Sequence, residues 1–210
     1  MMDTIFYIAI LIMSVVIHEV SHGFVAEKFG DHTARHAGRL TLNPIPHLDL
    51  FGSFILPFLL VISNASFVIG WAKPVPYNPE NLNNRKWGTV AVASAGILSN
   101  LLVAVIFSII IRIAVLYDYA GLMDLVSIAS VIVIVNLALA IFNLVPIPPL
   151  DGSKILFSLL PPSFYRFVSF FEEWALILLL VFVVFFSQYL YPILIYMTKL
   201  LTGLAFSGSF

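Results

Sequence analysis

Long apolar runs separated by short polar stretches make up most of this chain. The runs at residues 4–26, 90–117 and 125–145 are each long enough for a helix that crosses a bilayer, which needs about 20 predominantly apolar residues. Two further apolar segments follow at residues 164–186 and 189–206, with a break between them. This pattern predicts an all-α polytopic helix bundle.

The apolar stretch at residues 48–70 has a different composition from the others. Gly52, Pro57 and Asn64 interrupt it, and such residues favour turns over a continuous helix. We therefore predict a re-entrant or shallow hairpin here. With this stretch included, the chain has about five to six apolar segments.

Composition places the chain among integral membrane proteins. Hydrophobic residues make up 61% of its 210 residues and charged residues 10%, and the mean hydropathy is +1.05. These values differ strongly from those of a soluble domain. A net charge of -1 without a basic run gives no indication of nucleic-acid binding. We predict one membrane-embedded domain over residues 1–210, with a core at about 4–160 and additional C-terminal membrane helices at 161–210.

The first apolar run contains the motif His18-Glu19-Val20-Ser21-His22. Residues i and i+4 share a helix face, so His18 and His22 can bind one zinc ion while Glu19 lies beside them as a general base. Polar side chains at membrane depth cost free energy unless a metal, a partner or water compensates. The alternative is that both histidines only hydrogen-bond neighbouring helices, which leaves a buried Glu19 unexplained.

Two histidines leave a catalytic zinc site one protein ligand short. The chain has no cysteine, so the third ligand must be His, Asp or Glu. Asp151 is favoured because it directly follows an apolar span and the rigid turn at Pro148-Pro149. Its alternative role is the N-cap of a helix that starts near Gly152. The other candidates by residue type are His32, His36, His47 and Asp49.

Three motifs occur in order along the chain. They are His18-Glu19-x-x-His22 in the first span, Gly96-x-x-x-Asn100 in a middle span, and Asn143-x-x-Pro146-x-Pro148-Pro149-Leu150-Asp151-Gly152 after a later span. Together they resemble the site-2 protease family of intramembrane zinc metalloproteases. The resemblance covers residues from about 4 to 154 and does not include the inserted PDZ or nucleotide-sensing domains of larger members.

The resemblance implies a set of roles for these residues. His18, His22 and Asp151 would bind one Zn²⁺ per chain, Glu19 would be the general base, and Asn143 would lie near the substrate backbone. The implied reaction is hydrolysis of peptide bonds in or near transmembrane segments of membrane-protein substrates, as in regulated intramembrane proteolysis. We expect a multi-pass protein in the lipid bilayer of a prokaryotic cell membrane.

Other polar residues are candidates for substrate binding. Asn143 and Asn100 can donate a hydrogen bond to the oxyanion or to the substrate backbone, although asparagines also bond helices together. Trp71, Ala72 and Lys73 begin a segment that can pair with an unwound substrate as an added strand. The alternative is an interfacial loop anchored by Trp71 and Lys73. Resemblance to the membrane-associated β-loop of the family favours a short interfacial β-like loop.

The predicted metal site constrains the topology. The two motif histidines lie in the C-terminal part of the first span, and Asp151 lies just past the 125–145 span. These two spans must therefore run in the same direction, with the 90–117 span as the return crossing. Residues 48–70 then make no net crossing, which is tolerated where protein or a water-filled cavity shields the backbone.

Basic residues indicate the orientation in the membrane. Arg112 lies near the opposite end of the middle span, whereas seven basic residues fall on the side of the motif. The positive-inside rule then places the active site near the cytoplasmic face and the N-terminus outside. The seven residues are Lys28, Arg35, Arg39, Lys73, Arg85, Lys86 and Lys154.

Two other functions fit parts of the pattern. A non-proteolytic metal-binding scaffold or transporter needs ligands but no adjacent base, so Glu19 argues against it. A transporter also needs polar residues through the bilayer, whereas here they gather towards one face. A different HExxH membrane protease would use a distant glutamate, such as Glu172 or Glu173, in place of Asp151.

Overall fold

The computed structural model describes residues 2–55, 59, 62–63, 72–117 and 122–204, and these residues contain no strand. The chain is an all-α polytopic integral membrane protein, as predicted. Among the described residues, four helices are long and apolar enough to cross a membrane. This is slightly fewer than the five to six apolar segments expected from the sequence. These spans are Ile5–Lys28, Arg85–Leu116, Met123–Asn143 and Ala175–Thr202.

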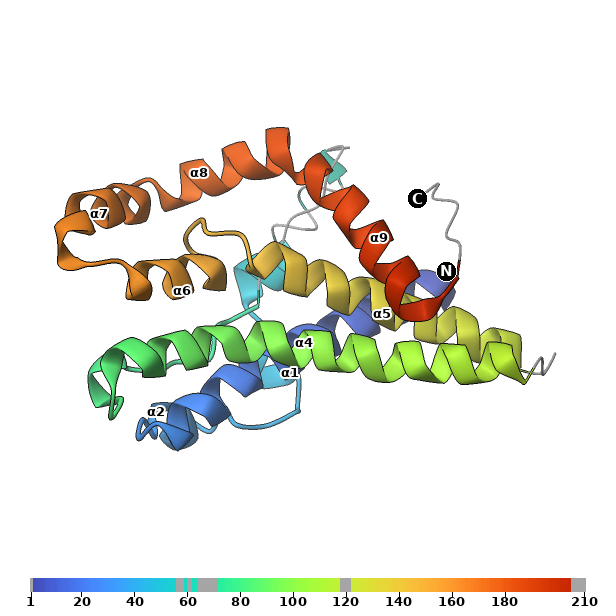
Figure 1. Cartoon of the computed structure of the whole chain (residues 1–210). Helices are drawn as coiled ribbons and strands as arrows, with labels where there is room; N and C mark the ends of the chain where they lie inside the picture. Colours follow the sequence, from blue (N-terminus) through green and yellow to red (C-terminus); the bar gives the residue numbers. More distant parts are fainter. Residues whose placement is uncertain (1, 56–58, 60–61, 64–71, 118–121, 205–210) are drawn as a thin grey trace.

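Three long helices form the centre of the molecule (Figure 1). They are α1 (Met2–Lys28), α4 (Arg85–Leu116) and α5 (Met123–Asn143). Helix α4 packs against both α1 and α5. Helices α1 and α5 run in the same direction and α4 runs in the opposite one, as the position of the predicted metal site requires (Figure 1).

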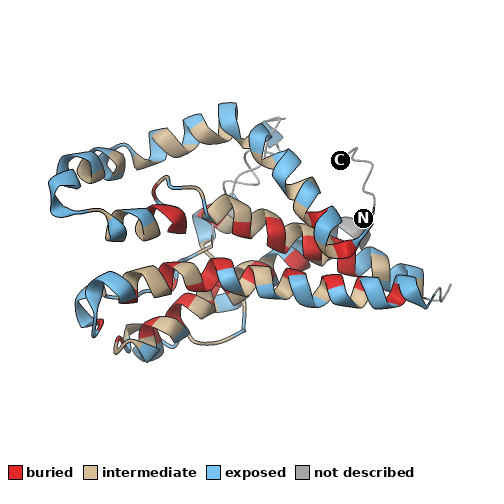
Figure 2. Ribbon diagram, viewed as in Figure 1, coloured by how far each residue is buried: buried red, intermediate tan, exposed pale blue. Residues whose placement is uncertain are grey.

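The buried residues lie on the sides of these helices that face one another (Figure 2). The apolar core contains Ile111 of α4 together with Val133 and Leu137 of α5. The outward side of α4 instead exposes large apolar side chains such as Leu98 and Leu102. Soluble monomers rarely expose large apolar surfaces, so this side of α4 fits contact with lipid.

Four shorter α-helices follow α5 in the described part of the chain. They are α6 (Asp151–Leu159), α7 (Tyr165–Glu173), α8 (Ala175–Val181) and α9 (Leu190–Thr202). The predicted segment 164–186 is therefore divided, because the chain turns at Trp174 between α7 and α8. A π-helical turn and a 3-10 turn at Phe182–Phe186 and Ser187–Tyr189 separate α8 from α9, which confirms the break expected near residues 187 and 188.

Helix α9 returns to the central helices and ends at Gly203. This glycine has φ of 75°, the left-handed conformation that commonly ends a helix. Arg112 of α4 donates hydrogen bonds of 2.6 Å to the carbonyl oxygens of Leu200 and Leu201 at this end. The arginine therefore satisfies acceptors that the end of α9 leaves free.

Residues 72–78, which we call the strap, cross the end of α1 without forming a strand. The Lys73 N–H donates to the His47 carbonyl at 2.8 Å, and the Arg39 guanidinium donates to the Lys73 carbonyl at 2.8 Å. Pro74 and Pro76 have no N–H and cannot take part in a regular ladder. The strap therefore differs from the predicted β-like loop, because its main chain bonds to separate parts of the protein.

Asp31 anchors the other end of the strap. Its carboxylate is fully buried and accepts hydrogen bonds from the Asn78 N–H at 2.7 Å and the Asn81 amide at 2.9 Å. Burial disfavours the charged carboxylate, but hydrogen bonds from Thr33, Asn81 and Asn78 outweigh this and lower the pKa of Asp31 below its ordinary value. The ionised carboxylate of Asp31 is therefore the form that accepts the Asn78 N–H and fixes this end of the strap.

In the described residues between α1 and α4, the short helical turns are α2 (Thr33–His36), a 3-10 turn at Ile45–His47, a π-helical turn at Leu50–Ile55 and a 3-10 turn at Pro79–Asn81. Asp49 precedes the π-helical turn, and its Oδ1 accepts from the Gly52 N–H at 2.7 Å. Most of the predicted hairpin at residues 48–70 lies outside the described residues.

Candidate active site

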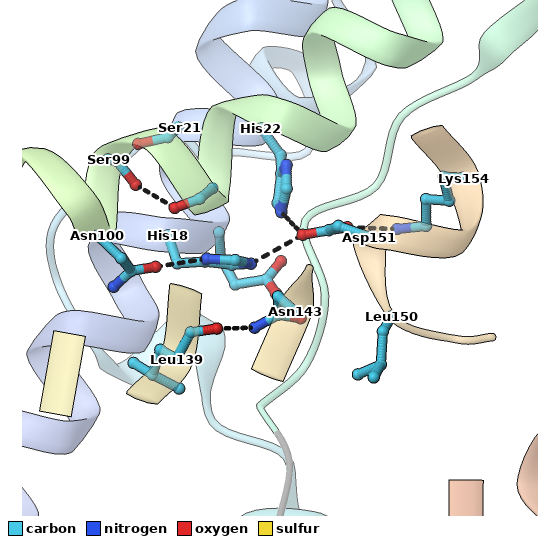
Figure 3. A network of polar contacts seen from close by, with 12 residues as sticks. His18, Ser21, His22, Ser99, Asn100, Leu139, Asn143, Leu150, Asp151 and Lys154 are labelled. Carbon is cyan, nitrogen blue, oxygen red and sulfur yellow. Dashed lines mark hydrogen bonds and ion pairs between the residues drawn. The ribbon is translucent and has the colours of Figure 1, made fainter. Parts of the chain in front are cut away.

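The three residues predicted as metal ligands meet where the C-terminal half of α1 faces the start of α6 (Figure 3). His18 Nε2 and His22 Nε2 each lie 3.1 Å from the same oxygen, Oδ2 of Asp151. All three residues are buried. Helix α1 supplies the histidines one turn apart, and the first residue of α6 supplies the carboxylate.

The second ring nitrogen of each histidine bonds to α4. His18 Nδ1 lies 2.6 Å from the side-chain oxygen of Asn100, and His22 Nδ1 lies 2.7 Å from the carbonyl oxygen of Val92. Both oxygens can only accept, so both Nδ1 atoms carry the hydrogen. In the neutral rings the two Nε2 atoms then present lone pairs towards Asp151.

This donor set fits a bound cation. Two nitrogen lone pairs and a carboxylate oxygen face one another at about the separation of ligands around one metal, and they repel unless a positive charge lies between them. Imidazole nitrogen and carboxylate oxygen are ordinary ligands of Zn²⁺, and catalytic zinc sites use three protein ligands. The arrangement therefore has the chemistry of a catalytic zinc centre.

The geometry also tests the alternative role of Asp151 as a helix N-cap. Helix α6 begins at Asp151 itself, and the residue in the cap position is Leu150. The second carboxylate oxygen, Oδ1, lies 3.0 Å from Nζ of Lys154. Both oxygens of Asp151 therefore face side chains, and the carboxylate points into the cluster.

Glu19 lies beside the two histidines. One carboxylate oxygen of Glu19 and the ring nitrogens of His18 and His22 lie within 4.8 Å of one another. Glu19 is half-buried, and its Oε2 accepts a hydrogen bond of 2.8 Å from the Val75 N–H of the strap. The strap therefore orients the carboxylate at the edge of the cluster.

The family model of peptidase family M50 matches residues 110–187 of this chain. The protein named "Putative zinc metalloprotease YwhC" from Bacillus subtilis (strain 168) is 39% identical over 175 residues, which cover 81% of this chain and 76% of that protein. This chain belongs to peptidase family M50. It is a metalloprotease with zinc as cofactor, and the family is the one that the three motifs resemble.

More distant relatives of this M50 peptidase carry a similar name. "Putative zinc metalloprotease Rip2" from Mycolicibacterium smegmatis (strain ATCC 700084 / mc(2)155) is 31% identical over 84% of this chain and 66% of its own length. The protein of the same name from Mycobacterium tuberculosis (strain ATCC 25618 / H37Rv) is 30% identical over 81% and 63%. The chain thus spans about two thirds or slightly less of the Rip2 proteins. No solved structure matches it.

Gly96 of the second motif lies on α4 opposite the two imidazoles. A Cβ atom built at this position would lie 2.6 Å from Nε2 of His18 and 2.6 Å from Nε2 of His22. Any side chain here would therefore occupy the space in front of both nitrogens. The M50 peptidase needs glycine at this position for the imidazoles, and not only for close approach of the helices.

We predict that Gly96→Ala weakens zinc binding at least about tenfold, the smaller effect seen when residues around a metal ligand are altered. The added methyl group forces both imidazoles to move. Chelator competition on the purified protein measures the change. Gly88→Ala is a matched control on the same helix, because its Cβ would meet the apolar side chains of Leu82 at 3.1 Å and Phe29 at 3.4 Å and neither imidazole. Equal zinc affinity of both variants would contradict the prediction.

The other ligand candidates lie outside the cluster. His32 is exposed and lies 3.3 Å from Glu27, and His36 is exposed. The ring of His47 is buried with its Nε2 2.9 Å from the Thr41 carbonyl oxygen. Asp49 caps the π-helical turn described above. Glu172 and Glu173 are exposed at the end of α7.

The substrate-binding candidates differ in position. Asn143 lies at the end of α5, and its amide nitrogen donates to the Leu139 carbonyl at 3.0 Å (Figure 3). Asn100 is fully buried between the helices. Ala72 and Lys73 begin the strap, and Trp71 lies outside the described residues.

Three residues of the site were not among the sequence candidates. Lys154 pairs with Asp151, and Asn136 and Ser14 join the buried network that leads to His18. Asn136 and Ser14 could have been noticed in the sequence because each is a polar residue inside an apolar run. The sequence does not show which neighbouring helix such a residue contacts.

Proposed function

We propose that this M50 peptidase hydrolyses peptide bonds in or near the transmembrane segments of membrane-protein substrates. The observation that carries the proposal is the meeting of His18, His22 and Asp151 between helices that are long and apolar enough to cross a bilayer. A substrate helix can approach such a site only within or at the edge of the membrane.

In this proposal His18, His22 and Asp151 hold the zinc ion. When bound there, zinc would supply Lewis-acid polarisation of the scissile carbonyl and would lower the pKa of water towards ~7. Lys154 holds Oδ1 of Asp151 at 3.0 Å and leaves Oδ2 facing the histidines. The lysine therefore supports coordination through one oxygen.

Glu19 takes the role of general base and passes the proton to the leaving amine. A carboxylate accepts up to about four hydrogen bonds, and the Val75 N–H occupies one position on Oε2. The remaining lone pairs are free to receive the proton of the attacking water. The same bond fixes the carboxylate beside the two imidazoles.

Asn143 and the strap are the proposed substrate contacts. The Asn143 amide bonds back to its own helix through one N–H, which leaves a second N–H and an oxygen for an extended backbone. The Lys73 and Val75 N–H groups already bond within the protein. Pairing of a substrate with Ala72 to Asn78 would therefore use the carbonyl of Val75 and the N–H of Tyr77, which have no partner among the described residues.

The distribution of charge supports an active site at the cytoplasmic face. Lys28 ends α1, Arg85 begins α4 and Lys154 lies in the first turn of α6, whereas Arg112 lies near the C-terminal end of α4. Lys86 lies 5.9 Å from the ring centre of the exposed Trp87, a pair typical of the membrane interface. We place the N-terminus outside a prokaryotic cell membrane.

The test uses purified protein in liposomes with a panel of single-span substrates. We expect about one bound zinc per chain, following the ligand count, and cleavage that stops on chelation and returns when zinc is added. Mass spectrometry of the products should place the cleaved bonds within or next to the substrate span. Cleavage that survives chelation, or that occurs only in distant soluble loops, would contradict the proposal.

A further inference from the structure

A continuous chain of hydrogen bonds crosses the three central helices and ends at His18. Asn136 of α5 donates from its amide nitrogen to Ser14 Oγ of α1 at 2.9 Å. Its oxygen accepts from the amide nitrogen of Asn100 on α4 at 2.8 Å. The Asn100 oxygen lies 2.6 Å from His18 Nδ1. The metal-site histidine is thus connected to residues of three helices.

Main-chain carbonyl groups determine which amide atom donates and which accepts in each of these hydrogen bonds. The Asn136 amide nitrogen also lies 2.9 Å from the Ile132 carbonyl oxygen, which can only accept. The amide nitrogen must therefore face Ile132, and the Asn136 oxygen must face Asn100. The Asn100 amide nitrogen then faces both this oxygen and the Ser14 carbonyl at 3.3 Å. Neither amide can rotate by 180° without placing two acceptors together.

The direction of these bonds decides the state of the His18 ring. With both amides fixed, the Asn100 oxygen is the only atom that can face His18 Nδ1. This oxygen accepts, so Nδ1 must carry the ring hydrogen, and Nε2 keeps its lone pair. Nε2 is the atom that lies 3.1 Å from Asp151. The hydrogen-bond chain therefore selects the tautomer that can bind a metal.

His22 obtains the same tautomer in another way. Its Nδ1 bonds directly to the Val92 carbonyl at 2.7 Å, a main-chain group that no side-chain substitution removes. Among the described residues His18 has no such main-chain partner at Nδ1, and this nitrogen depends on side chains alone. The two histidines should therefore respond differently to substitutions at Asn100 and Asn136.

We propose that Asn100 and Asn136 are positioning residues that fix the rotamer and the Nδ1–H tautomer of His18. Both asparagines are fully buried, and an asparagine amide within the membrane is costly unless its hydrogen bonds are made. The inference rests on the proposed role of His18 as a zinc ligand. It gives Asn100 a role in place of the substrate contact expected from the sequence, because its amide groups already face His18, Ser14 and Asn136.

The test measures zinc affinity by chelator competition in the full-length protein. We expect Asn100→Leu to weaken zinc binding by about 10–100-fold, the range for partners of metal-binding histidines. Asn136→Leu should weaken it by about tenfold, because Asn100 keeps its bond to the Ser14 carbonyl. Asn100→Asp retains an oxygen for His18 Nδ1 and, with its other oxygen protonated, an O–H that can donate to Asn136; it should restore part of the affinity.

Ser130→Ala is the control on the same helix as Asn136, since its buried hydroxyl donates to the Val126 carbonyl of its own helix and takes no part in the bonds that lead to His18. It should leave zinc affinity unchanged. Thermal unfolding of the metal-free proteins shows whether each variant is folded. Nitrogen-15 spectra of histidine-labelled, metal-free protein report the tautomer directly, with His18 identified by the signal missing from His18→Gln. We expect Nδ1–H in the wild type and a mixture of tautomers in Asn136→Leu.

The outcomes separate this inference from the proposed function. If His18→Gln leaves zinc affinity unchanged, the proposed ligand set fails. If His18→Gln loses zinc but Asn100→Leu and Asn136→Leu bind it as the wild type does, the positioning role fails. An Asn136→Leu spectrum with only the wild-type tautomer would overturn it as well.

Discussion

Glu19→Gln should abolish peptide-bond hydrolysis while zinc stays bound. A general base contributes about 10²–10⁴-fold to a rate, and an amide cannot take the proton. Glutamine keeps an oxygen that can accept from the Val75 N–H, so the strap should remain in place. The measurement pairs the cleavage rate of a single-span substrate with the zinc content of the same preparation.

Glu27→Gln is the matched control for this substitution. Glu27 lies two turns further along α1 and pairs with the exposed Arg35 and His32, away from the two motif histidines. This variant should cleave at the wild-type rate. Cleavage by Glu19→Gln at a rate close to that of Glu27→Gln would rule out Glu19 as the base.

Asp151→Ala should remove zinc and activity together. Loss of a direct ligand should weaken zinc binding by more than about 100-fold, the upper range for residues that only support a ligand. The substitution also leaves the Lys154 ammonium group without its carboxylate partner at 3.0 Å, close to a site that must hold a cation. Zinc analysis after dialysis and the cleavage assay measure the two losses.

Glu172→Ala and Glu173→Ala distinguish Asp151 from the alternative third ligands. Both glutamates are exposed at the end of α7. Zinc content should be normal in these two variants. Zinc retained by Asp151→Ala but lost in either glutamate variant would assign the third ligand to α7 instead.

The proline-rich turn shows how local and long-range information combine at the site. Pro146, Pro148 and Pro149 end the preceding span by their restricted backbone, and this was readable from the sequence. The sequence did not show whether the Asp151 side chain caps α6 or faces the histidines of another helix. The structure places Oδ2 of Asp151 against the two histidines of α1 and Oδ1 beside the Lys154 ammonium group.

Asn100 marks a limit of the motif-based prediction. The sequence places it in a span four residues after Gly96, where either a substrate contact or a bond between helices was open. The structure surrounds it with His18, Ser14 and Asn136, which lie 82, 86 and 36 residues away along the chain. Periodicity within one helix cannot show which residues of another helix come opposite.

The sequence by itself determined the membrane class, the long helices and the pairing of His18 with His22, because these depend on apolar length and on helical spacing. The sequence motifs also predicted Asp151 as the third member of the cluster. Only the tertiary structure decided how α4 serves the site, with Gly96 making room for both imidazoles and with Asn100 and Val92 facing their second nitrogens. These contacts depend on the packing of three helices.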